Sequence, residues 1–311
     1  YWWSPANFPT TCDVLVAVHD LTGVEDFTAH TLILMSNGIG ANLAGNEELV
    51  DRVPCFSEVH AKMIAATTSI PFEKCRVTGL GVDLSDYPKK PPPKVKGRML
   101  TANDPARGLW QTLDVFDLVK KEVPEATLHC TYDLDRQFEP YRWQQNGLGE
   151  LMREAKKRVL GTPGIVSLGA LSRADVIQQQ IECQVHCWPS DPPNVGSQIH
   201  GITQMECAAA GCALVLSDVE AFPEVFGSGA IILPTIGRHV QVNDAVGLRV
   251  SSQDYADHVV RLMTSEKAFW KAQLRSLRLA KRNTWDAVLV QWDGMLNDRV
   301  AELLYEEKGS E

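Results

Sequence analysis

Residues whose types and spacing could bind an anion are concentrated in the segment Gln198 to Glu206, which reads QIHGITQME. Gly201 has no Cβ, so the backbone there permits close approach of a ligand. A helix that begins just after Gly201 leaves the amides of Ile202 and Thr203 without intrahelical partners, and such amides bind phosphates. Glu206, about one turn further on, can accept two hydroxyl hydrogen bonds, as a ribose diol would offer. The alternative is an ordinary glycine loop between a strand and a helix, with no ligand.

The same segment resembles the signature of retaining GT-B glycosyltransferases of family 4, the glycosyl transferases group 1. The family pattern E-x-F-G-[IL]-x-x-x-E aligns with residues 198–206, residues 188–190 (WPS) precede it, and residues 217–225 (SDVEAFPEV) match S-D-x-x-x-x-P-E-V. The sequence departs from the pattern at Gln198, where the family has its first Glu, and at His200, where it has Phe. Because the resemblance implies that the first position contacts the donor sugar, Gln198 implies either a different donor or lost turnover.

A second resemblance covers residues 99–109 (MLTANDPARGL), which look like the start of the family's donor domain. There a strand ends shortly before a basic residue that meets the donor phosphates, and Arg107 takes that position. A guanidinium can bind two phosphate oxygens at once, whereas the alternative is a solvated arginine at a helix start. The Arg that many members carry in a preceding G-R is Ala102 here. We therefore expect phosphate binding to rely on Arg107 and the loop amides, with Arg98 as a more distant candidate.

These resemblances imply a retaining, metal-independent glycosyltransferase that needs no cofactor. It would move a sugar from a nucleotide-diphosphate sugar to the hydroxyl of a glycan or small-molecule acceptor, with fixed positive charge and oriented amides stabilising the leaving diphosphate. His19 and Asp20, which follow the strand at residues 13–18, are candidate contacts for sugar or acceptor; His19 is alternatively a hydrogen-bonded strand-end histidine. Two other functions remain open: a degenerate GT-B protein that binds a nucleotide sugar or glycan without turnover, and a sugar phosphorylase or nucleotide-sugar epimerase.

Composition argues against several classes of protein. The 311 residues carry a net charge of −9, which argues against general nucleic-acid or anionic-membrane binding, although a local basic groove is compatible with it. No apolar run reaches the length of a membrane span and no N-terminal signal is visible, so we expect a cytoplasmic protein without an integral membrane segment. The eight cysteines lie in apolar patterns, as reduced thiols do. Strand alternation places His186 opposite Cys183, Val185 and Cys187, so we predict no metal site.

The elements that position these residues follow from the alternation of apolar and amphipathic stretches through residues 97–234. Such alternation predicts a parallel sheet that is covered by helices on both faces. The predicted strands are Met99–Ala102, Ala126–Tyr132, Ile165–Leu168, Cys183–Trp188, Ala213–Ser217 and Ala230–Leu233, and the helices are Leu109–Glu122, Gly147–Val159, Arg173–Gln180 and Ile202–Ala210.

Ligands of open parallel sheets bind at the carboxyl ends of the strands. The predicted strands place Arg107 and Glu206 at one such edge. Asn103 and Gly169 are expected at the same edge as candidate contacts for the donor. Tyr132 and residues 189–198 are expected there as well.

The predicted architecture is α/β of the GT-B type, with two Rossmann-like domains that have parallel sheets. Residues 1–88 would form a partial N-terminal acceptor-side domain, residues 89–283 the C-terminal nucleotide-sugar-binding domain, and residues 284–311 a helix that crosses back to the first domain. Residues 87–96, rich in proline and lysine, read as a stiff connector. The N-terminal domain looks truncated, because it is about half the usual size and the chain begins at Tyr1. The final helix has an apolar face that we expect the N-terminal domain to cover, formed by Trp285, Val288, Leu289, Trp292 and Leu296.

Overall fold

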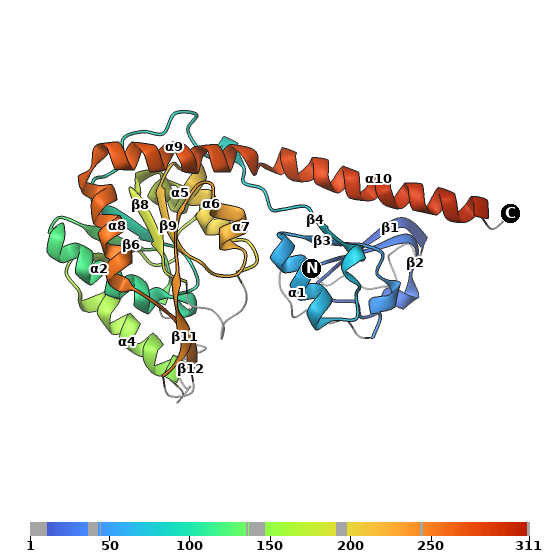
Figure 1. The fold of residues 1–311 in the computed structure, drawn as a ribbon, viewed down its shortest axis with the longest axis horizontal. Coiled ribbons are helices and arrows are strands. Elements are labelled where there is room, and N and C mark those ends of the chain that lie inside the picture. The colour runs from blue at the N-terminus through green and yellow to red at the C-terminus, as the bar shows by residue number, and fades with distance from the viewer. Residues whose placement is uncertain are drawn as a thin grey trace. The chain divides into compact units, whose positions relative to one another are not determined.

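The chain folds into two compact units in the computed structural model, which describes residues 11–36, 43, 45–134, 136, 147–190, 198–242 and 245–309. Unit 1 consists of Tyr1–Gly81 together with Trp285–Glu311, and unit 2 of Val82–Thr284 (Figure 1). Within the described part of the chain, no helix combines the length and the apolar character needed to cross a bilayer.

Unit 2 is built on a six-stranded parallel sheet with the order β10-β9-β8-β5-β6-β7. Four of its strands, β5, β6, β8 and β9, are buried along almost their whole length, as expected for a sheet covered on both faces. The strands agree with the predicted ones to within two residues at each end, and they confirm the predicted α/β class. They are β5 (Arg98–Thr101), β6 (Thr127–Cys130), β7 (Ile165–Ser167), β8 (Val185–Trp188), β9 (Ala213–Ser217) and β10 (Ile231–Leu233).

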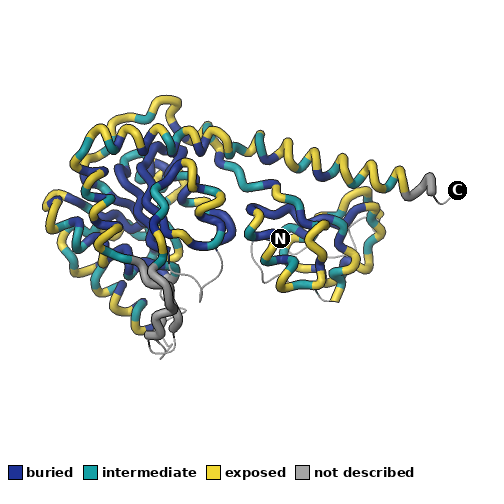
Figure 2. Tube along the Cα trace, viewed as in Figure 1, coloured by how far each residue is buried: buried dark blue, intermediate teal, exposed yellow. Residues whose placement is uncertain are grey.

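Two hydrophobic cores cover the two faces of this sheet (Figures 1 and 2). One core packs helices α2, α4 and α8 against the sheet, and the other packs α5, α6 and α7; α9 contributes to both. Serine side chains cap three of these helices, because Ser172, Ser251 and Ser265 accept hydrogen bonds from the backbone amides three residues on. The helices are α2 (Leu109–Glu122), α4 (Gly147–Gly161), α5 (Arg173–Glu182), α6 (Ile202–Ala209), α7 (Phe222–Phe226), α8 (Ser252–Thr264) and α9 (Glu266–Arg282).

Unit 2 also contains elements that the sequence analysis did not predict. Strands β11 (Thr235–Val242) and β12 (Ala245–Val250) form an antiparallel hairpin. Its polar residues and glycines interrupt the apolar alternation on which the strand predictions relied. The described part of unit 2 also contains two short 3-10 helices, η5 (Leu84–Asp86) and η6 (Pro105–Arg107).

The described residues of unit 1 contain four strands that pair in parallel. β1 (Thr11–Val18) pairs with β2 (Thr28–Met35), and β3 (Val53–Cys55) pairs with β4 (Cys75–Val77). A bridge between Ile33 and Arg52 links the two pairs, and a separate core fills this unit. The helices are η2 (Val24–Asp26), η3 (Glu47–Leu49), α1 (Glu58–Thr67), η4 (Phe72–Lys74) and α10 (Trp285–Gly309).

Helix α10 is joined to the strands of unit 1 by ion pairs. Arg299 Nη2 lies 2.9 Å from Asp51 Oδ1, and Arg52, whose side chain is 7% exposed, pairs with Glu302. These contacts join the C-terminal helix to residues 51 and 52, just before β3, although the two segments are far apart in the sequence.

The apolar face predicted for α10 is only partly buried. Val288 is buried, and so is Met295, which lies one residue before the predicted Leu296. Trp285 and Leu289, however, are 47% and 58% exposed. The expectation that the whole face is covered was therefore wrong for its N-terminal part.

Candidate active site

The order of the strands in unit 2 defines where a ligand would bind. β5, the first strand of the unit, lies between β6 and β8, so the chain proceeds to one side of β5 through β6 and β7 and to the other through β8, β9 and β10. In sheets of this order, the crevice outside the carboxyl ends of the two central strands is the ligand site. The loops that follow β5 and β8 are the ones that the sequence analysis selected.

The loop after β5 places Asn103 and Arg107 at this edge. Gln204 Nε2 donates a hydrogen bond of 3.0 Å to Asn103 Oδ1, which connects this loop to the first turn of α6. Arg107 ends η6, its Nε lies 3.9 Å from Asp104 Oδ2, and its side chain is 36% exposed. The guanidinium is therefore held loosely by one carboxylate and remains accessible to an anion.

Arg98, the more distant candidate for phosphate binding, lies at the opposite end of β5 from Asn103 and Arg107. It begins β5 and pairs with Glu182, the last residue of α5. Because the amino end of a parallel strand is opposite the ligand edge, the expectation that Arg98 could reach the phosphates was wrong.

Helix α6 begins directly after Gly201, as the sequence predicted. Gly201 caps the helix with φ +112°, and a Cβ there would lie 2.8 Å from Gln204 Oε1 and 3.0 Å from Phe222 Cε1. Only glycine fits this position without displacing its neighbours. The first intrahelical hydrogen bond runs from the Met205 amide to the Gly201 carbonyl, so the amides of Ile202, Thr203 and Gln204 precede it.

Glu206 is held in place by two residues of α5. Arg173 Nη1 donates to Glu206 Oε1, and Gln180 Nε2 donates to Glu206 Oε2 at 2.9 Å. The Glu206 side chain is 13% exposed. Each carboxylate oxygen accepts more than one hydrogen bond, so both retain capacity for hydroxyl groups of a ligand.

The partners of Glu206 are fixed in turn. Arg173 also donates to Asp86 Oδ2 at 3.0 Å; burial opposes its ionisation, but the hydrogen bonds to Glu206 and Asp86 outweigh this and raise the pKa of Arg173. Tyr87 OH donates to Gln180 Oε1 at 2.8 Å, which orients the amide so that its nitrogen faces Glu206. Sequence reasoning missed this network, because no local pattern connects α5 with residues 86 and 87.

The loop after β8 is anchored at Gln198. This residue is 6% exposed, its backbone amide donates to the carboxylate of Glu220, and its carbonyl accepts from the Ala221 amide at 3.1 Å. The intervening residues 191–197, which fall within the predicted ligand segment, lie outside the described residues.

Glu220 is a site residue that sequence reasoning did not select. It is one of two non-glycine residues with positive φ among the described residues, at φ +44° in the loop after β9. Burial raises the pKa of its carboxyl, while the hydrogen bond from Gln198 and the charge of Arg107 act against this rise. Glu220 thus connects Gln198 electrostatically with Arg107. Its position lies within the matched residues 217–225, but at a place where the family pattern specifies no residue.

His200 occupies the position of the family's phenylalanine and packs as an aromatic residue. It is 3% exposed, and its ring centroid lies 6.2 Å from that of Phe226 at an interplanar angle of 65°. Burial lowers the pKa of His200 to about 4. The imidazole is therefore neutral at pH 7.

Two predicted contacts lie at other strand ends. Gly169 follows β7 with φ +69°. His19 follows β1 in unit 1 with φ +64°; its amide donates to the Met35 carbonyl at 3.0 Å, and its Nδ1 lies 3.4 Å from Ser36 Oγ. Since His19 belongs to the other unit, its role at the donor remains a prediction.

Cys183 does not share a face of the sheet with Val185 and Cys187, contrary to the prediction from strand alternation. Cys183 belongs to the core that contains Trp188 and Cys212, whereas Val185 and Cys187 belong to the core on the other face. β8 begins only at Val185, so strand alternation does not extend back to Cys183. Within the described residues, no group of three His, Cys, Asp or Glu side chains has a geometry that could hold a metal ion.

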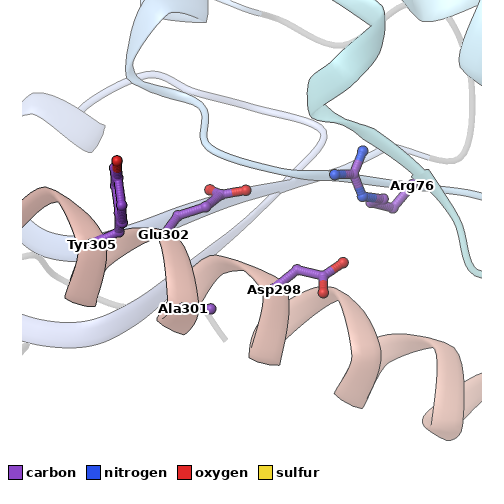
Figure 3. Close-up of a pocket in the computed structure, with 5 residues that line it drawn as sticks. All are labelled: Arg76, Asp298, Ala301, Glu302 and Tyr305. Carbon is purple, nitrogen blue, oxygen red and sulfur yellow. The ribbon is translucent and has the colours of Figure 1, made fainter.

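Unit 1 contains a pocket of about 460 Å³ that includes none of the predicted site residues. It lies between β4 and α10 (Figure 3), and Arg76 Nη1 donates there to the Glu73 carbonyl at 2.6 Å. The lining residues are Arg76, Asp298, Ala301, Glu302 and Tyr305.

Comparison with known proteins identifies the fold but no sequence relative. No protein-family model matches the chain, and no curated protein matches it. Sucrose-phosphate synthase from Thermosynechococcus elongatus is similar in structure, with a TM-score of 0.67 and 12% identity over 93% of this chain and 74% of that one.

Two further structures contain a nucleotide. The pneumococcal O-GlcNAc transferase GtfA in complex with UDP and GlcNAc has a TM-score of 0.60 and 16% identity, and covers 88% of this chain and 53% of its own. HepE from Anabaena in complex with UDP and glucose has a TM-score of 0.59 and 13% identity, and covers 88% of this chain and 71% of its own. The chain thus spans between about half and three quarters of the length of these three structures. Its fold is the GT-B fold that these glycosyltransferases share, as the sequence predicted.

Proposed function

We propose that this chain is a glycosyltransferase that binds a nucleotide-diphosphate sugar at the carboxyl edge of the unit 2 sheet. One observation supports this proposal: the two central strands β5 and β8 are followed along the chain by η6, which ends at Arg107, and by α6, which carries the N-terminal amides and Glu206. This edge is where open sheets of this order bind nucleotides.

Each group has a role that follows from its chemistry. The amides of Ile202 and Thr203 and the Arg107 guanidinium would hold the diphosphate, since both present N–H donors with positive charge or partial charge. Glu206, already oriented by Arg173 and Gln180, would accept the two ribose hydroxyls with its remaining lone pairs. Asn103 and Gly169 would line the same edge.

The sugar would lie near Gln198 and Glu220. The resemblance assigns donor-sugar contact to position 198, and Glu220 supplies a carboxylate directly beside it. As the bond between sugar and diphosphate breaks, negative charge builds on the diphosphate, where Arg107 and the α6 amides would stabilise it. We also propose that transfer retains the configuration of the sugar and needs no metal ion, and both of these proposals rest on the family resemblance. The acceptor would be a glycan or a small molecule, and His19 of unit 1 is a candidate contact for the sugar or the acceptor.

A binding experiment tests the donor site. We expect calorimetry to show tight binding of at least one nucleoside diphosphate, and UDP is tested first because the GtfA and HepE structures contain it. Arg107→Ala should weaken UDP binding about 10-fold or more while leaving uridine binding unchanged, because a charged hydrogen bond contributes about 1.5–3 kcal/mol. Arg261→Ala on α8, an exposed arginine, is the matched control. Equal weakening of both ligands by Arg107→Ala would place Arg107 away from the phosphates.

Glu206→Ala should also remove most nucleotide affinity, but through the ribose, so that uridine and UDP weaken by the same factor. Its circular dichroism spectrum should match the wild type. Unchanged affinity for both ligands would show that Glu206 serves only the network with Arg173 and Gln180.

A turnover experiment separates transfer from binding alone. Donor hydrolysis or transfer by the wild type supports the proposed activity, whereas binding without turnover indicates a degenerate site. Gln198→Glu restores the family's carboxylate with little change in volume and should raise turnover of a degenerate site or shift the preference of an active one among donor sugars. Phosphate-dependent cleavage or an epimerised donor would instead indicate a phosphorylase or an epimerase. Identical turnover of all donors by wild type and mutant would show that residue 198 does not face the sugar.

A further inference from the structure

The outer face of α9 is strongly basic in a chain whose net charge is −9. The helix carries six lysines and arginines and a single carboxylate, Glu266, a net charge of +5. Its buried face is formed by residues such as Phe269, Ala272 and Leu279, which pack into the two cores of unit 2. At 100° per residue the exposed side chains fall on the opposite face. Glu266 and Arg282 are exposed at the two ends of the helix, and we call the exposed residues between them the α9 outer face: Lys267, Trp270, Lys271, Leu274, Arg278 and Lys281.

Helix stability does not account for this arrangement. Lys267 and Lys271 lie in the first two turns, where positive charge is unfavourable in the field of the helix dipole. They are also four residues apart, and like charges at that spacing destabilise a helix. Within the described part of the chain, no ion pair involves Lys267, Lys271, Arg278 or Lys281. Their charges are therefore available to an external partner.

Two large apolar side chains lie among these cations. Trp270 and Leu274, one turn apart, are 51% and 50% exposed. Trp270 Nε1 donates to Glu266 Oε1 at 3.1 Å, so the one carboxylate of the helix is bonded to the indole. A helix with this combination, basic residues flanking an exposed Trp and Leu, is suited to the interface of an anionic bilayer, where apolar rings enter the headgroup region and cations meet lipid phosphates.

A second basic segment lies beside α9. Residues 88–96 follow η5 and carry the exposed Lys89 and Lys90. Pro91 Cγ and Gln273 Nε2 each lie 3.2 Å from the position that a Cβ of Gly211 would take, so this segment and α9 meet there. Figure 1 shows the segment passing next to α9. Gln273 is buried, so the two segments meet at the inner side of α9, and the segment adds two exposed lysines close to this helix.

We propose that the α9 outer face docks on an anionic lipid surface, as a peripheral contact of unit 2. Seventeen residues of helix give a contact about 25 Å long, which lies in the plane of the interface. This proposal is independent of the proposed activity, because none of the α9 residues belongs to the donor site. It also modifies the expectation drawn from net charge, since the cations are concentrated on one face.

Vesicle co-sedimentation of the full chain tests this proposal. Vesicles of phosphatidylcholine with about one third phosphatidylglycerol are compared with pure phosphatidylcholine, at low and at high NaCl. We expect binding to the anionic vesicles only, lost at high salt because surface attraction is screened. Lys267→Glu with Lys271→Glu should reduce partition by roughly 30-fold, since each basic residue near an anionic surface contributes about fivefold.

The double variant should fold at least as well as the wild type, because carboxylates are favourable in the first turns of a helix. Lys121→Glu with Lys157→Glu, which makes the same charge change on exposed lysines of α2 and α4, is the matched control and should retain binding. Trp270→Ser should weaken binding to the anionic vesicles while leaving the salt dependence of that binding unchanged. The proposal is wrong if the wild type does not sediment with anionic vesicles, if both double variants lose binding equally, or if a DNA duplex binds this face in place of the vesicles.

Discussion

At the scale of single residues, the candidate site at the carboxyl edge of the unit 2 sheet is organised by contacts between polar groups that are distant in sequence. Glu220 receives the Gln198 amide and lies in the field of Arg107, and Glu206 is oriented by Arg173 and Gln180. Gln198, Arg107 and Glu206 were predicted from the sequence, whereas Glu220, Arg173 and Gln180 were identified only in the structure. Two predictions concern residues whose environment only the structure revealed.

Glu220→Gly should reduce turnover of the donor sugar about tenfold or more while leaving UDP affinity unchanged. Glycine adopts positive φ without strain, so the mutation removes the carboxylate but keeps the backbone of the loop, and a lost charged hydrogen bond costs about 1.5–3 kcal/mol. Steady-state kinetics and calorimetry measure the two effects. Asp218→Asn, the neighbouring exposed carboxylate, is the control; an equal loss in both variants would mean that Glu220 has no specific role.

His200 should make the stability of the protein depend on pH. Because burial lowers its pKa to about 4, the unfolded chain binds a proton between its ordinary pKa, near 6.5, and pH 4, whereas the folded chain does not. The contribution to stability is therefore present above pH 6.5 and is lost as the pH falls towards 4. Urea unfolding should show that His200→Phe removes up to about 3 kcal/mol of this pH dependence. Parallel stability curves for wild type and variant across this range would contradict the assignment.

At the scale of elements, the turn before α6 carries the strongest backbone constraint of the site. Gly201 combines φ +112° with Phe222 and Phe226 within about 3 Å of any added Cβ. The same turn positions the amides that the proposed function assigns to the diphosphate. The position of the first amides of α6 thus depends on one residue that lacks a side chain.

Gly201→Ala should destabilise the fold by about 1–3 kcal/mol, through backbone strain and overpacking, and should lower UDP affinity as well. Gly294→Ala on α10 is the matched control. Nothing lies within 4 Å of a Cβ there, so the change should stabilise the protein by up to about 1 kcal/mol through helix propensity. Chemical denaturation measures both. Similar stability changes in the two variants would refute the constraint at Gly201.

At the scale of the whole molecule, each unit has hydrophobic cores of its own. The two cores of unit 2 consist of residues between Val82 and Thr284, and the core of unit 1 consists of residues before Gly81. All residues that the proposal assigns to the diphosphate and ribose belong to unit 2.

A fragment of residues 82–284 should therefore fold and bind UDP with an affinity within about threefold of the full chain, but it should not transfer sugar, because the acceptor side is absent. Calorimetry and circular dichroism test the binding and the folding, and a transfer assay with the full chain as reference tests the loss of activity. A folded fragment that does not bind UDP would show that unit 1 supplies part of the nucleotide site.

The sequence by itself determined the sheet of unit 2 and the end of its strands at which the candidate site residues lie. Apolar runs such as residues 213–217 and helices such as 109–122 are local patterns, and parallel strands with helical crossovers place their carboxyl ends together whatever the rest of the chain does. The turn at Gly201 could also be predicted, because a glycine between a strand and a helix indicates a backbone conformation or a close approach that a side chain would prevent.

The tertiary structure alone decided which side chains support the site. Glu220, Arg173 and Gln180 lie 22 to 33 residues away from the residues they bind, and such contacts leave no periodic signal in the sequence. It also decided exposure: Trp270 and Leu274 have the same apolar character as Phe269, yet only the packing of α9 against the sheet determines which of them faces solvent. Local propensity and period specify elements, whereas burial and long-range hydrogen bonds depend on where those elements meet.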